Sequence, residues 1–130
     1  MTINTARRVA ALATLLAVAA TASAHHSVAG QFDTTQQATL IGTITKIEWI
    51  NPHTYVHLDV PDEHGNITSW RLESLPTAML RKAGLTSELL MGGNGKVTAT
   101  TLPARDGTQH LGYLLKLTYE DGHYYQLAAQ

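Results

Sequence analysis

The order of residue periodicities along the chain is the feature that most constrains its fold. Three β-type runs come first, each rich in β-branched or alternating apolar residues, at 40–50, 54–60 and 67–73. Helical spacing follows over 76–84, where Pro76 suits a first turn and Gly84 suits a stop. The β pattern then returns in three further runs, at 95–102, 111–119 and 123–127.

Three strands, one helix and two or three strands is the element order of an oligonucleotide/oligosaccharide-binding (OB) type barrel. We therefore expect a mainly β fold, a small OB-like antiparallel β-barrel with one short helix after the third strand. A small antiparallel sandwich is the alternative. The first run has apolar residues on both faces, which predicts a bent strand with Gly42 at a bend or bulge. Trp70 and Leu72 share a face of the third run, and we expect Trp70 in the core.

The first 24 residues have the pattern of a secretory signal peptide. Arg7 and Arg8 precede an apolar run over 9–20, and small residues follow it. The run is shorter than the about 20 residues that span a bilayer. We therefore expect cleavage, location in the periplasm or secretion, and no stable membrane insertion afterwards. Because the chain has no cysteine, it forms no disulfide and carries no lipid on a cysteine.

These features divide the chain into a signal peptide over 1–24, an N-terminal arm over 25–38 with Val28 and Phe32 as candidate anchors, and an OB-like β-domain over 39–130. Cleavage after Ala24 is preferred, and cleavage after Ala22 is the alternative. Acidic residues outnumber Lys and Arg by 10 to 9, and no basic stripe is present. We therefore expect no nucleic-acid binding, and the expected partner is a small ligand or a periplasmic protein.

Two histidines, His25 and His26, stand at the expected new chain end. With the preferred cleavage, the α-amine and the imidazole of His25 offer two nitrogens, and copper can displace the amine proton near neutral pH. A third nitrogen from His26, His53 or His57 would complete a T-shaped copper set. With the earlier cleavage, His25 is the third residue, which suits a square-planar Cu(II) or Ni(II) site. The alternative interpretation is a solvated histidine tail.

Tyr55, His57 and Asp59 share one face of the second β-type run, and His53, directly before the run, has the same parity. Histidines at i and i+4 of a strand are about 13 Å apart, at about 3.3 Å per residue, so they cannot share a metal ion without a bend. We therefore expect each to pair with a histidine from elsewhere, such as the arm. The alternative is a solvated face on which His53 bonds to local backbone in its Asn-Pro-His turn.

Charged residues of the neighbouring runs extend this into a candidate ligand face around Tyr55. Glu48, Arg71 and Glu73 are spaced for a cross-strand charge ladder. Glu48 and Glu73 have no nucleophile partner in view, and the sequence contains no Gly-rich phosphate loop, Ser-His-Asp order or zinc spacing. We therefore expect a protein that is not an enzyme.

Four segments together carry a resemblance to a known family: "AHHS" at 24–27, "GTITKIEWINPHTYVHLDV" at 42–60, "GNITSWRLE" at 65–73 and "LRKAGL" at 80–85. They resemble a family of short exported bacterial proteins that is known only as a domain of unknown function. The Asn-Pro-His element after a β-strand is the most specific part, followed by Trp-x-x-Glu. The resemblance covers essentially all of 25–130. It implies an exported small β-domain and no particular activity.

The leading hypothesis is that the protein binds a transition metal at its mature N-terminus, with help from the second strand. Copper is the preferred metal. The main alternative is a metal-free module that binds a ligand or a protein in the periplasm. An oxidative copper enzyme is the third, weakened by the short chain and the absence of a substrate-cleft pattern.

Export provides a direct test of the leader. Expressed with its own leader in a bacterium with two membranes, the protein is expected in the periplasmic fraction without residues 1–24, or alternatively without 1–22. Intact-mass spectrometry of that fraction identifies the first residue. An uncleaved product retained in the membrane would contradict the signal peptide.

Overall fold

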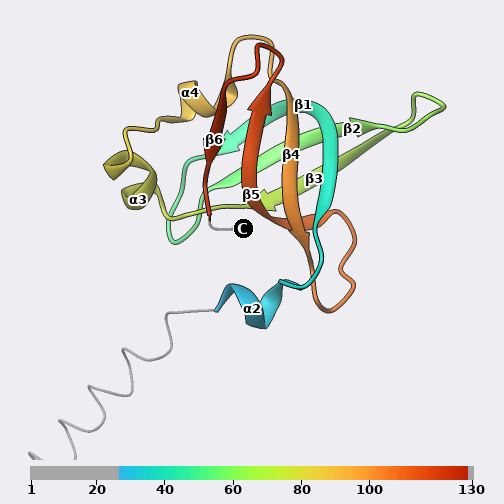
Figure 1. Cartoon of the computed structure of the whole chain (residues 1–130), viewed down its shortest axis with the longest axis horizontal. Coiled ribbons are helices and arrows are strands. Elements are labelled where there is room, and N and C mark those ends of the chain that lie inside the picture. The colour runs from blue at the N-terminus through green and yellow to red at the C-terminus, as the bar shows by residue number, and fades with distance from the viewer. Residues whose placement is uncertain (1–26, 129–130) are drawn as a thin grey trace, which may run out of the picture.

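Strand β1 (Ala38–Glu48) lies between two antiparallel neighbours in a sheet that curves until it closes (Figure 1). The computed structural model describes residues 27–128. Its other strands are β2 (Tyr55–Pro61), β3 (Ile67–Glu73), β4 (Lys96–Pro103), β5 (Leu111–Tyr119) and β6 (Tyr124–Gln126). The sheet order is β3-β2-β1-β4-β5-β6, and β3 also pairs with β5 in parallel. This pairing closes five strands into a barrel, so the predicted OB-like connectivity is confirmed and the sandwich is excluded.

A bulge explains why β1 has apolar residues on both of its faces. Ile44 pairs with Leu58 and Lys46 pairs with His57, so Thr45 is the extra residue between them. The inward-facing parity changes at this point, so Leu40 and Ile44 before the bulge and Ile47 after it all face the core, whereas Ile41 stays on the exposed face. The bulge therefore lies after the position that the sequence predicted.

Gly42, the predicted bend or bulge site, has a different role in the same strand. Here the backbone of β1 passes so closely over β2 that a Cβ on Gly42 would collide with the carbonyl oxygen of Asp59. Only a residue without a side chain permits this approach without moving one of the strands. The glycine thus allows the two strands to cross closely, and the bulge at Thr45 changes which residues of β1 face the core.

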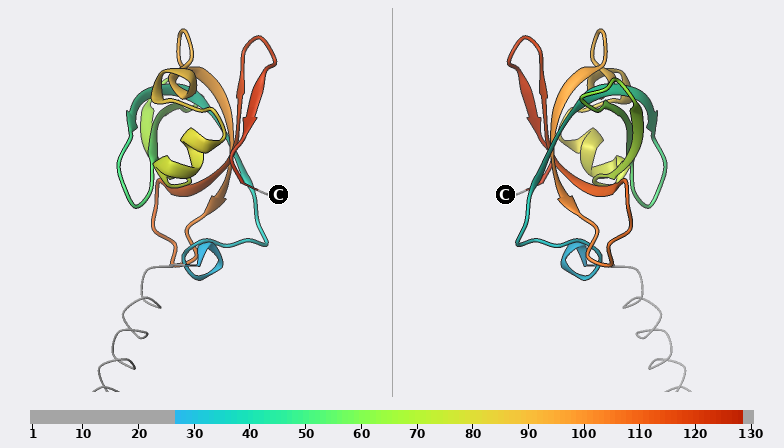
Figure 2. Two further views of the ribbon diagram at one scale, coloured as in Figure 1. Left: turned by 90° about the vertical axis from the view of Figure 1, so that its left-hand side faces the viewer. Right: turned by 90° about the vertical axis from the view of Figure 1, so that its right-hand side faces the viewer.

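Two short helices cover one end of the barrel, α3 (Thr77–Lys82) and α4 (Ser87–Met91). In both views of Figure 2 the strands form a ring and α3 lies across its opening. Leu80 of α3 and Leu90 of α4 are fully buried in the main core. The predicted helical segment is confirmed, and Gly84 follows it with φ +80°.

The inward side chains of the strands form that core, and they include Leu40, Val56, Leu58, Leu72, Val97, Leu114 and Leu117. Trp70 packs against this core and lies edge-on to the ring of His110, but it is only partly buried. Its predicted face is therefore correct, but it lies at the margin of the core rather than within it. The reason is that Trp70 lies beyond the three residues of β3 that pair with β5.

The arm is anchored on the outside of the barrel through α2 (Val28–Gln31) and Phe32. Phe32 is 1% exposed and packs with Leu102, Tyr113 and Leu115 in a second apolar cluster on the outer face of β4 and β5. The Arg105 guanidinium donates to the carbonyl oxygens of Ala29 and Phe32, at 3.0 and 3.4 Å. Phe32 is therefore the anchor that the sequence predicted.

Replacing Gly42 tests the close strand crossing. Gly42→Ala is expected to lower the free energy of unfolding by about 1–3 kcal/mol, because the added methyl group forces two paired strands apart. The matched control is Gly93→Ala, since a Cβ at Gly93 has nothing within 4 Å. Urea unfolding of the three proteins measures the effect. Equal unfolding midpoints would contradict this account of β1.

Candidate functional site

Polar side chains gather on the outer face of β2 and its two neighbours. Strand register explains the cluster, because one row of cross-strand partners joins Glu48, Tyr55 and Glu73, and the adjacent row joins Lys46, His57 and Arg71. The inward-facing Val56 and Leu58 of β2, by contrast, are fully buried. We define the polar face as these six residues together with His53, which immediately precedes β2.

One histidine–carboxylate pair of the polar face leans toward β1. His57 Nε2 lies 2.8 Å from Glu48 Oε1, and Arg71 Nη2 lies 3.4 Å from the other oxygen of the same carboxylate. The hydrogen bond from His57 holds the pKa of Glu48 below its usual range, and the bond from Lys46 adds to this effect. The predicted charge ladder is thus confirmed between Glu48 and Arg71. The guanidinium of Arg71 also stacks 3.6 Å above the centre of the Tyr55 ring.

The second histidine–carboxylate pair leans the other way, toward β3. His53 Nδ1 lies 3.3 Å from the carbonyl oxygen of Ser74 and 3.4 Å from Glu73 Oε1. Both partners only accept, so Nδ1 carries the hydrogen and Nε2 of the neutral ring keeps its lone pair. Within the described part of the chain, Nε2 has no hydrogen bond. His53 therefore bonds to backbone, as the solvated-face alternative held, but to the end of β3 rather than to its own turn.

Glu73 is the most buried charged residue of the polar face, with 9% of its side chain exposed. Two tyrosines flank it: Tyr55 is its cross-strand partner in β2, and Tyr113 is its partner in β5. Burial raises the pKa of both phenols above the usual value, and the nearby charge of Glu73 raises it further. The carboxylate thus lies between two phenols and one imidazole.

The docked arm adjoins this end of the polar face. Tyr113, the β5 partner of Glu73, has its ring centroid 5.5 Å from that of Phe32. Val28 packs against the same apolar cluster, as does Leu111, the β5 partner of Arg71. Tyr113 was not singled out from the sequence as a residue of the site. The outward parity that Tyr113 shares with Leu111 and Leu115 was the available signal for an arm-binding row.

The predicted metal ligands divide into two groups. His25 and His26 lie outside the described residues. Within 27–128, no three His, Cys, Asp or Glu side chains are close enough together to hold a metal ion. His53 and His57 turn to different carboxylates on opposite sides of β2, which agrees with the expectation that they do not share an ion. A metal site on this face would need ligands from another segment.

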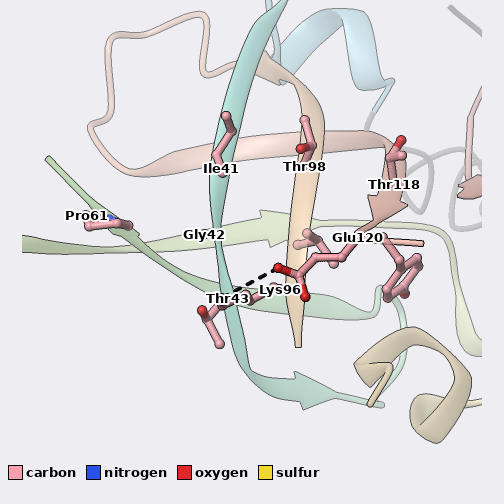
Figure 3. Close-up of a pocket in the computed structure, with 10 residues that line it drawn as sticks. Ile41, Gly42, Thr43, Pro61, Lys96, Thr98, Thr118 and Glu120 are labelled. Carbon is pink, nitrogen blue, oxygen red and sulfur yellow. Dashed lines mark ion pairs between the residues drawn. The ribbon is translucent and has the colours of Figure 1, made fainter. Parts of the chain in front are cut away.

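A groove elsewhere on the barrel is the main alternative site (Figure 3). It runs over β1, β4 and the end of β5, with a volume of about 330 Å³ and the exposed Ile41 on its wall. Its two charged residues, Lys96 and Glu120, pair with each other at 3.5 Å, and no histidine lines it. The groove therefore lacks the ligating groups of the polar face, which remains the candidate site.

These observations define the class of the protein: it is a closed OB-type barrel that carries two histidine–carboxylate pairs on its outer β2–β3 face. That face is where OB domains commonly bind their ligands. The chain belongs to the family described as Family of unknown function (DUF6152), whose model matches residues 11–113, and the predicted resemblance is confirmed.

Two further comparisons identify no related protein. A search of curated proteins and a search of solved structures each find no match to the chain. The helices of residues 27–128 all lack the length and apolar character that crossing a bilayer requires.

The two histidines are expected to contribute unequally to stability. His53→Ala removes the imidazole from a nearly buried carboxylate, so it should lower the free energy of unfolding by about 1–3 kcal/mol. His57→Ala leaves Glu48 with Lys46 and Arg71, and the expected loss is below about 1 kcal/mol. Urea unfolding at neutral pH compares the variants. A larger loss in His57→Ala would contradict the ranking of the two pairs.

Proposed function

We propose that this protein is an exported, periplasmic copper-binding protein whose site combines the mature N-terminus with His53. The α-amine and imidazole of His25 would supply two nitrogens, and Nε2 of His53 would supply a third. The observation that carries the proposal is the orientation of His53: Nδ1 bonds to the carbonyl oxygen of Ser74, with Glu73 Oε1 3.4 Å away, and Nε2 has no partner in the described part of the chain.

The surroundings of His53 match those of metal-binding histidines in general. Such a histidine donates its second ring N–H to a carboxylate or a backbone carbonyl, which fixes the tautomer and the direction of the ring. His53 has both kinds of acceptor, Glu73 Oε1 and the carbonyl oxygen of Ser74. Amine and imidazole nitrogens in a planar arrangement favour Cu(II) or Ni(II), and copper has the highest affinity among the divalent ions of this series.

The docked arm supports the participation of the chain end. Ser27, the residue directly after His26, caps α2, and its hydroxyl accepts from the backbone N–H of Gly30 at 3.1 Å. Phe32 then fixes the arm beside Tyr113, the strand partner of Glu73. A tether of this kind makes binding by the second half of a chelate intramolecular and raises its effective concentration.

His53 is a better candidate than His57 for the body of the site. His57 turns toward β1, away from β5 and the arm, and Arg71 stands in the β3 position between them. His53 turns toward β3, the strand that β5 joins. The proposal therefore narrows the four predicted ligands to His25 and His53, with His26 available as a neighbour and His57 outside the site.

Copper titration of the correctly processed protein tests this proposal. We expect nitrogen-rich square-planar Cu(II) in the paramagnetic resonance spectrum. An extra Met before His25, His25→Ala and His53→Ala should each lower the affinity at least tenfold, about 1.4 kcal/mol. Phe32→Ala should also weaken binding, because the arm loses its anchor.

His57→Ala is the matched control, and its affinity should stay within about threefold of the native value, about 0.7 kcal/mol. Competition with a chelator of known affinity provides the measurement. Equal weak binding by every variant would indicate a solvated histidine tail. The metal-free interaction module would then be the better interpretation of the polar face.

A further inference from the structure

The end of the barrel that carries α3 and α4 differs in character from the rest of the surface. Six large apolar side chains of the described residues are strongly exposed, and three of them, Ile50, Met79 and Leu89, lie at this end. An apolar side chain that is exposed singly needs no explanation. A group of them at one end of a small barrel indicates a surface that binds a partner.

Contacts between α3 and the segment after β1 bring an aromatic ring and a cation into the same surface. The hydroxyl of Thr77 donates to Asn51 Oδ1 at 2.8 Å, which fixes the residue after Ile50 against α3. The guanidinium of Arg81 lies over the ring of Trp49, 5.9 Å from its centre. The half-buried Trp49 therefore adjoins an exposed cation on one side and the exposed Ile50 on the other.

This end is also the basic end of a chain in which acidic residues outnumber Lys and Arg. Arg81 and Lys82 are exposed in the last turn of α3, and in the described part of the chain neither forms an ion pair with a carboxylate. They complement the helix dipole, which does not account for the exposed apolar side chains beside them. Asp62 and Glu63 lie in the turn between β2 and β3, which projects on the opposite side of the barrel from α3 and α4 (Figure 1).

We propose that the α3–α4 end is a membrane-docking surface that binds the anionic headgroups of a phospholipid bilayer. Its exposed members are Ile50, Met79, Arg81, Lys82 and Leu89, with Trp49 at the edge. Cations beside scattered apolar side chains suit a surface that is anionic outside and apolar beneath, and tryptophan is favoured at that boundary. The separation of charge would direct the basic end to the bilayer and turn the acidic β2–β3 turn away from it. Docking of this kind is independent of copper binding and needs no membrane-spanning segment.

Co-sedimentation with vesicles tests the role of the two cations. The processed, metal-free protein should bind vesicles that contain phosphatidylglycerol more tightly than vesicles of phosphatidylcholine alone, and added salt should release it. Replacing both cations, Arg81→Gln with Lys82→Gln, should lower the partition coefficient about 30-fold, at about fivefold for each cation near an anionic surface. The matched control is Lys96→Gln with Lys116→Gln, which removes the same charge from β4 and β5. The control should stay within about threefold of the native protein.

Two further matched pairs test the apolar contact and the orientation of the barrel. Met79→Ser should weaken binding to the anionic vesicles, whereas Ile67→Ser, which removes an equally exposed apolar side chain beside the β2–β3 turn, should not. The chain has two tryptophans, and brominated phospholipid should quench the emission of Trp49 alone. Trp49→Phe should therefore abolish the quenching, and Trp70→Phe should retain it.

Three results would overturn membrane docking. The first is equal binding of the native protein to both kinds of vesicle, or to neither. The second is an equal loss in the two double variants, which would indicate an effect of net charge without a particular surface. The third is a loss of self-association in the Arg81 and Lys82 variant, measured by sedimentation velocity, when the native protein does not bind vesicles. The α3–α4 end would then be an interface between copies of this chain.

Discussion

The parallel pairing between β3 and β5 is the constraint on which the rest of the molecule depends. It joins Arg71, Leu72 and Glu73 to Leu111, Gly112 and Tyr113, and it turns an open sheet into a barrel. The inward pair, Leu72 and Gly112, closes the core at this point. The outward pairs place the polar face of β2 and β3 beside the apolar row of β5 that receives the arm. One ladder therefore determines both the enclosed core and the neighbourhood of the candidate site.

Alternation along β2 explains why one short strand serves two purposes. Its inward residues, Val56 and Leu58, have no exposed surface and anchor the barrel, so its outward residues are free to carry polar groups. The two histidines with this outward parity approach different neighbouring strands. His57 is held by a carboxylate that also serves Lys46 and Arg71, whereas His53 has a nearly buried carboxylate and a backbone carbonyl. His53 and His57 therefore have different surroundings, although they share one parity in the sequence.

The sequence was sufficient to predict the fold because each element has a local cause. Alternation produced the strands, Pro76 and Gly84 bounded the helical segment, and element order indicated OB connectivity. The bulge at Thr45 was not predictable, because it depends on which residue of β2 lies opposite. The partial exposure of Trp70 was not predictable either, because it depends on where β5 stops pairing with β3.

The candidate site was partly predictable for the same reason. The polar residues of β1, β2 and β3 follow from strand parity, and their grouping on one face was expected from sequence. The burial of Glu73 and its proximity to Tyr113 were not, since the parallel ladder joins segments that lie far apart along the chain. The docking of Phe32 was anticipated only as an anchor of undefined location, because nothing local to the arm identifies the strand that receives it.

The shortness of the closing ladder has a consequence for local opening. Three residue pairs join β3 to β5, compared with seven between β2 and β3, and parallel pairing is slightly less stable per residue than antiparallel pairing. The seam between β3 and β5 is therefore the place where the barrel opens at the lowest cost in free energy. Phe32 packs on Tyr113 of β5 beside this seam, so separation of β3 from β5 would also disturb the apolar cluster that holds the arm.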